Sequence, residues 1–97
     1  MAAYLLANIT VTDPARFAEY GRRVQPMIAA FGGKYCVRGG AVTAVEGEPG
    51  LHRVVVVEFA DMAALRRFYD SPEYAPLIAL RQSAATGTVA LVEGYTG

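Results

Sequence analysis

The chain has 97 residues, close to the commonest domain size, so we expect a single domain over residues 1–97. Nine basic and nine acidic side chains cancel, and an isoelectric point near 6.6 argues against nucleic-acid binding, which usually depends on a basic surface. One cysteine and one histidine are too few for a disulfide framework or a dedicated zinc site, so we expect no metal.

The remaining composition predicts a cytoplasmic protein that associates with itself. The apolar start MAAYLLANITVTD lacks the positive charge of a signal sequence, and no run reaches the ~20 apolar residues of a membrane span. Charged residues make up only 19% of the chain, against a typical ~25%. A chain this short also buries only about 60–65% of its surface by folding alone. We interpret the shortage of charge as a sign of a buried subunit interface.

The first predicted elements are a strand and a long helix. In residues 3–11, AYLLANITV, apolar side chains fall on both strand faces, so we expect both faces to be covered. Asp13 and Pro14 fit the N-cap and the first position of a helix, which continues as an apolar stripe over residues 17–31. Pro26 lies inside that stripe and should kink the helix or split it in two.

The stretch FGGKYCVRGG, residues 31–40, is glycine-rich and carries two cations, so two interpretations compete. A phosphate-binding loop follows a strand, opens a helix and places Ser or Thr after its lysine. Here the helix comes first, a strand follows, and Tyr35 comes after Lys34. We therefore interpret Gly32–Gly33 as the helix end and KYCV as a strand, with a bulge or bend at Gly39–Gly40.

Further strands are expected in the second half of the chain. The strand after the bend should resume over residues 41–47, before a turn at residues 47–50. Residues 52–59, HRVVVVEF, form the strongest predicted strand because β-branched residues dominate them. Gly87 should precede a last strand over residues 88–95.

Between these strands the sequence predicts helical structure in two pieces. Asp61 should cap a second helix that turns four residues inward: Met62, Leu65, Phe68 and Tyr69. Ser71 and Pro72 should restart the helix, which then reaches Arg81 or Gln82. The element order is β-α-β-β-α-β. This order predicts an α+β ferredoxin-like sandwich, a four-stranded antiparallel sheet with the helices on one face.

That architecture would leave the second face of the sheet bare. Because both faces of the predicted strands are apolar, the simplest way to cover it is the same face of a second copy. We therefore expect a homodimer in which two sheets face each other.

Three segments, GGKYCVRGG, VVVVEFADMAALRRFYDSPEY and LVEGY, carry a family resemblance in their order and spacing. From Tyr4 to Gly94 the chain resembles the family known as domain of unknown function 1330, within the dimeric α+β barrel superfamily. The resemblance implies a ferredoxin-like fold, here a dimeric α+β barrel, and a homodimer with facing sheets. It supplies no reaction, because the family has none assigned.

Relatives in that superfamily include cofactor-free monooxygenases, haem-degrading enzymes, muconolactone-isomerase-like proteins and stress proteins. The haem-degrading relatives use an Asn–Trp–His set. This chain has Asn8 and His52, but it has Phe68 where family members often carry a tryptophan, and it has no tryptophan at all. The resemblance therefore implies no haem, and we expect no cofactor.

Five polar side chains are the candidate ligand-binding residues: Arg38, Tyr69, Ser71, Tyr74 and Arg81. We expect Arg38 to share a strand face with Lys34 and Cys36, beside glycines that let a ligand approach, although a salt bridge or a solvated edge is the alternative. Tyr74 and Arg81 are seven residues apart, so they lie on one helix face. Ser71 should cap a helix N-terminus.

Two functions follow as hypotheses. The first is binding or transformation of a small, partly apolar carboxylate or phenolic metabolite, with a cofactor-independent monooxygenase or isomerase as the enzymatic form. His52, whose titration range suits acid–base chemistry, and Tyr69 are its candidate catalytic residues. The second is a non-catalytic interaction dimer in which the two tyrosines pack the helices on the sheet and Arg81 pairs with an acid such as Glu73.

Overall fold

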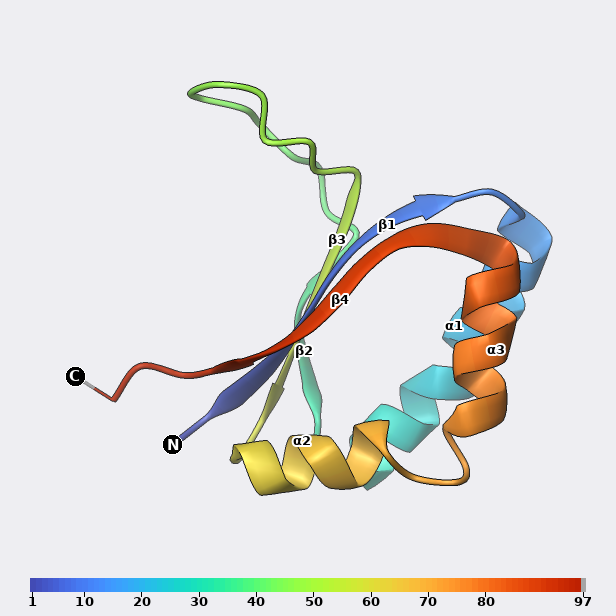
Figure 1. The fold of residues 1–97 in the computed structure, drawn as a ribbon, viewed down its shortest axis with the longest axis vertical. Helices are drawn as coiled ribbons and strands as arrows, with labels where there is room; N and C mark the ends of the chain where they lie inside the picture. Colours follow the sequence, from blue (N-terminus) through green and yellow to red (C-terminus); the bar gives the residue numbers. More distant parts are fainter. Residues whose placement is uncertain (97) are drawn as a thin grey trace.

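The computed structural model describes residues 1–96, so Gly97, the last residue of the predicted domain, lies outside the described residues. Its elements are, in chain order, β1 (Ala3–Val11), α1 (Pro14–Ala30), β2 (Lys34–Arg38), β3 (Arg53–Phe59), α2 (Met62–Tyr69), α3 (Ala75–Ala84) and β4 (Ala85–Glu93). The strands form one antiparallel sheet in the order β2-β3-β1-β4. All three helices lie on one side of this sheet (Figure 1). The predicted α+β architecture is confirmed.

Local side-chain bonds start the first two helices where the sequence predicts. Asp13 Oδ1 accepts a hydrogen bond from the Arg16 amide at 3.1 Å, and Asp61 Oδ1 accepts one from the Ala64 amide at 2.8 Å. Of the two outcomes predicted for Pro26, a kink or a split, the split is wrong, since α1 continues through that residue. Pro26 is exposed, so water can bond the carbonyl that the missing N–H leaves free.

The connection between α2 and α3 differs from the prediction. Ser71 Oγ accepts from the Tyr74 amide at 3.3 Å, the same three-residue bond as in the two caps above, but residues 72–74 form a turn and α3 begins only at Ala75. From there α3 runs to Ala84, and β4 follows without a loop. Gly87 therefore lies inside β4 and not before it.

An irregularity in β2 decides which way its side chains face. Tyr35 is opposite Val57, but the next pairs are Val37 with Val56 and Arg38 with Val55, so Cys36 is an extra residue. An extra residue of this kind shifts the alternation of faces by one. The sequence-based grouping of Arg38 with Lys34 and Cys36 is therefore wrong. Arg38 shares its face with Tyr35, and the predicted bulge lies at Cys36 instead of at the glycines.

The predicted strand over residues 41–47 is also wrong. Residues 41–51 form neither helix nor strand, are exposed, and project away from the sheet (Figure 1). At the base of this loop the Gly39 amide donates to the Val54 carbonyl at 2.7 Å. On the other limb the Asn8 side chain donates to the Gly50 carbonyl at 3.0 Å and accepts from the His52 amide at 2.9 Å. The loop is thus held at its ends only.

The two faces of the sheet have different environments. On the helix side, Val57, Phe59, Leu65 and Phe68 are the largest fully buried side chains. On the opposite side, Leu6, Val37 and Val92 are 39%, 39% and 40% exposed. We call this second side the outer face. Within the part of the chain that is described, no helix combines the length and the apolar character needed to cross a bilayer.

Candidate functional site

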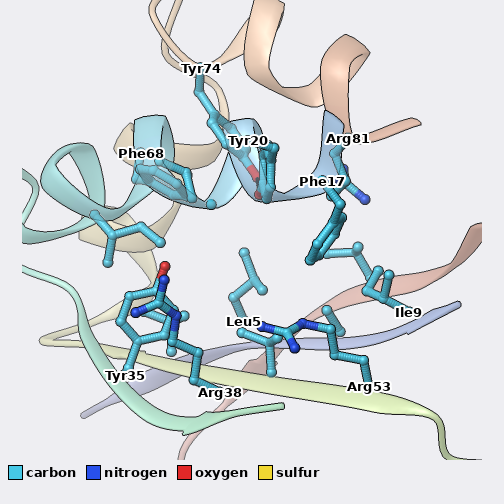
Figure 2. Close-up of a pocket in the computed structure, with 17 residues that line it drawn as sticks. Leu5, Ile9, Phe17, Tyr20, Tyr35, Arg38, Arg53, Phe68, Tyr74 and Arg81 are labelled. Carbon is cyan, nitrogen blue, oxygen red and sulfur yellow. Dashed lines mark hydrogen bonds between the residues drawn. The ribbon is translucent and has the colours of Figure 1, made fainter. Parts of the chain in front are cut away.

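A cavity lies between the sheet and the helices (Figure 2). Its empty space is about 610 Å³, a figure that includes space open to solvent. Every strand and helix contributes to its lining: Leu5, Ala7, Ile9, Phe17, Tyr20, Gly21, Val24, Ile28, Tyr35, Arg38, Arg53, Val55, Val57, Phe68, Tyr74, Arg81 and Val89.

Most of this wall is apolar because of simple periodicity. Alternate residues of β1 and β3 point toward the helices, which places small and β-branched side chains on the floor. On α1, Phe17, Tyr20, Val24 and Ile28 recur at helical spacing and form the roof. The position of Gly21 in the same face leaves space beside the Arg38 guanidinium. The result is an apolar cavity with few polar groups.

Three arginines supply those polar groups. The Arg38 guanidinium lies over the Tyr35 ring, 4.9 Å from its centroid, and the Arg53 guanidinium lies over the Phe17 ring at 5.3 Å. Stacking of this kind uses the flat face of a guanidinium and leaves its N–H edges free. Arg81 reaches the cavity from α3 on the opposite side (Figure 2).

Within residues 1–96, no carboxylate forms an ion pair with these guanidiniums. The lining contains no Asp or Glu. Among residues 1–96 the ion pairs are Arg16–Asp13 and Arg66–Asp70, both at 3.6 Å, so the predicted alternative of an Arg81–Glu73 pair is not formed. The Nε atoms of Arg53 and Arg81 are buried without a hydrogen-bond partner in this part of the chain. The cavity therefore carries uncompensated positive charge.

The half-buried Tyr20 and the buried Tyr74 meet beside Arg81. The Tyr20 and Tyr74 hydroxyl oxygens are 2.7 Å apart, and either can donate. Burial raises the pKa of Tyr20, and the neighbouring Tyr74 adds to the effect. Burial also raises the pKa of Tyr74, although the hydrogen bond to Tyr20 and the charge of Arg81 partly oppose it. Both phenols stay protonated near neutral pH.

The structure brings together three of the five predicted ligand-binding residues, because Arg38, Tyr74 and Arg81 line the cavity. Tyr69 stays outside the lining, with its ring 5.5 Å from that of Tyr74. Ser71 is buried in the turn below, where its hydroxyl donates to the Phe68 carbonyl at 2.8 Å. Both residues support the position of Tyr74.

The candidate catalytic residue His52 lies elsewhere. It is exposed at the start of β3 and does not line the cavity. The His52 amide donates to the Asn8 side chain. Asn8 lies between the lining residues Ala7 and Ile9 in β1, so its side chain is on the opposite, outer face of the sheet, and His52 lies beside it. Any role of His52 or Tyr69 in catalysis stays a prediction.

Sequence reasoning missed three polar lining residues. The apolar stripe predicted over residues 17–31 includes Tyr20, and a tyrosine there brings a hydroxyl to the helix face that packs on the sheet. Arg53 is two and four residues before Val55 and Val57 in the strongest predicted strand, so all three share one face. This spacing could have predicted a cation on the core face of the sheet. Tyr35 could not be placed, since its orientation depends on the bulge at Cys36.

Comparisons with known proteins agree with this fold. A family model described as Domain of unknown function (DUF1330) matches residues 2–95. The structure resembles the RPA0582 protein of unknown function from Rhodopseudomonas palustris (TM-score 0.78, 18% identity, covering 99% of this chain and 84% of that chain). It also resembles SnoaB, a cofactor-independent oxygenase from Streptomyces nogalater (TM-score 0.64, 19% identity, 99% and 95% covered). No curated protein sequence matches significantly. At these identities the likeness concerns the fold alone.

Proposed function

Because the chain belongs to the family described as Domain of unknown function (DUF1330), whose description assigns no reaction, we propose a function from the cavity itself. The protein binds a small, partly apolar metabolite that carries a carboxylate or a phenolic group. The ligand lies between the sheet and helices α1 and α3, with its polar end at the arginines and its apolar body against Leu5 and the valines of the floor.

One observation carries this proposal: three guanidiniums line a largely apolar cavity that has no acidic side chain. A buried N–H without an acceptor costs about 1–3 kcal/mol. Among residues 1–96, Arg53 and Arg81 each have such a group at Nε. An oxygen-rich ligand would give these arginines an acceptor and a counter-charge that the lining side chains do not supply.

The lining favours binding over proton abstraction. It contains no His, Asp, Glu or Cys, the side chains that usually act as bases near neutral pH. Its phenols are poor bases, because burial keeps Tyr20, Tyr35 and Tyr74 protonated by raising each pKa. The likeness to SnoaB therefore supports the fold but identifies no catalytic group in this chain. An enzymatic form of the function would need a ligand that reacts without a protein base.

Binding is tested by calorimetry with small carboxylates and phenols at millimolar concentration. We expect at least one to bind, and we expect Arg81→Gln to weaken that binding. Arg66→Gln is the matched control, since Arg66 is exposed on α2, pairs with Asp70 and is not part of the lining. A complete lack of binding across both classes contradicts the proposed function. Equal weakening by both variants contradicts the assignment to the cavity.

We further propose that the protein is a homodimer joined through the outer face. Leu6, Val37 and Val92 leave apolar area exposed on this one side of the sheet. Lys34 lies opposite Glu58 in the register, so this face carries both signs of charge and can be complementary to itself in a twofold pair. Sheets pack face to face through apolar side chains of this kind.

Sedimentation velocity at micromolar concentration tests the dimer. We expect Leu6→Lys to convert it to monomers, because a cation would be buried in the interface. Val45→Lys, in the loop and 88% exposed, is the control that should stay dimeric. A wild-type particle of 10.4 kDa at these concentrations contradicts the proposal.

The cytoplasm is the proposed location. The one cysteine, Cys36, is an exposed free thiol, which a reducing compartment preserves. Fractionation of cells that express the tagged chain tests this, and recovery from the extracellular or periplasmic fraction would contradict it.

A further inference from the structure

The polar groups of the cavity are almost entirely hydrogen-bond donors. The lining holds three arginines and three tyrosines, and every other lining side chain is apolar. A guanidinium has five N–H donors and no acceptor, whereas a phenol can donate once and also accept. The lining side chains therefore offer many more protons than lone pairs, and this imbalance constrains the ligand.

The tyrosine pair does not correct the imbalance. Tyr20 and Tyr74 share one hydrogen bond of 2.7 Å, which uses one proton and one oxygen. The proton of the accepting hydroxyl then needs a further acceptor, and the only lining side chain outside the pair that has a lone pair to offer is another phenol, Tyr35, because the arginines only donate.

These donors come from two opposed layers. Tyr35, Arg38 and Arg53 project from the sheet, while Tyr20, Tyr74 and Arg81 project from the helical layer, and both sets point into the same space (Figure 2). The arginines of each layer lie close to its tyrosines, since Arg38 and Arg53 act on the pKa of Tyr35 and Arg81 acts on those of Tyr20 and Tyr74. Each layer thus presents cationic and neutral donors together.

We propose that the ligand is a monocarboxylate with an apolar body and no hydrogen-bond donor of its own, bound with its carboxylate between the Arg53 and Arg81 guanidiniums. This inference rests on the proposed function and selects one of its two ligand classes. A carboxylate offers about four lone-pair positions and a charge that balances the cations. A phenol would add another proton to a donor-rich site, and an amine would add a further positive charge.

Four probes of one size separate these possibilities: benzoate, benzamide, phenol and benzylamine. Calorimetry on the full-length wild-type protein needs no variant, so it does not depend on the folding of a mutant. We expect benzoate to bind at least about tenfold more tightly than phenol, which is the ratio that one charged hydrogen bond supplies. Benzamide, which has the shape of benzoate without its charge, should also bind more weakly, and benzylamine should not bind.

Two variants then assign the selectivity to residues. Arg53→Gln and Arg81→Gln should each weaken benzoate binding about tenfold or more while leaving phenol binding within about twofold. Arg66→Gln should change neither. Equal affinity for phenol and benzoate overturns the inference and leaves the proposed function standing. Binding of benzoate that neither variant changes also overturns it, whereas an absence of binding by all four probes counts against the proposed function as well.

Discussion

Replacement of Gly39 by alanine should displace the Arg53 guanidinium and weaken carboxylate binding. Gly39 ends the β2–β3 ladder with φ +70°, and its missing side chain leaves the space that this guanidinium occupies. A Cβ atom at Gly39 would lie 2.7 Å from Arg53 Cζ and would also overlap Nη1, whereas ordinary contact begins at 3.4 Å. The guanidinium must therefore move by roughly 1 Å, which misaligns hydrogen bonds whose length tolerance is about 0.3 Å.

Gly47 provides a matched control for the backbone. It has φ +64° in the same loop, and a Cβ atom there would meet nothing within 4 Å. Both alanine variants should lose about 1–2 kcal/mol of unfolding free energy, because each places a Cβ in the left-handed region. Only Gly39→Ala should lose benzoate affinity, by about tenfold to a hundredfold, since a hydrogen bond to a charged group contributes about 1.5–3 kcal/mol.

The assay pairs urea unfolding with calorimetric titration of benzoate for the two variants and the wild type. Equal benzoate affinity for Gly39→Ala and Gly47→Ala would show that the position of Arg53 does not matter for binding. A Gly39→Ala protein that loses far more stability than Gly47→Ala would show that Arg53 holds the loop and not the ligand.

Three further predictions concern stability. Tyr20→Phe should lower the unfolding free energy by about 1 kcal/mol in urea, because it removes the hydrogen bond to Tyr74; an unchanged midpoint contradicts this. Burial raises the pKa of both phenols above the ordinary 10.0, so the unfolded chain ionises first, and the stability that these phenols contribute should be constant below about pH 9 and fall as pH rises above about 10. Urea midpoints measured across this pH range test how steeply stability falls with pH. The fall should be less steep in Tyr20→Phe, and a wild-type stability that does not change with pH would contradict the reasoning. Gly87→Ala should cost at least about 3 kcal/mol or prevent folding, because its Cβ atom would overlap the Asn8 carbonyl where β4 pairs with β1 at φ +143°; a thermal midpoint near that of the wild type refutes it.

The sequence alone predicts the features of this protein that depend on neighbouring residues. The caps at Asp13 and Asp61 are side-chain bonds that span three residues, and the faces of α1 and β1 follow from fixed periods of 3.6 and 2. The same local rules fail at residues 41–47, where the β-type pattern has no strand beside it to pair with.

The candidate site depends on pairings between distant segments, which no local pattern specifies. The extra residue at Cys36 is defined only by the register of β2 against β3, and it alone turns Arg38 into the cavity. Tyr20 and Tyr74 are 54 positions apart in the chain and meet because α1 and the turn before α3 pack on one sheet face. Short-range geometry therefore determines the elements and their order, whereas the close packing of the sheet and the helices decides which arginines and tyrosines share one space.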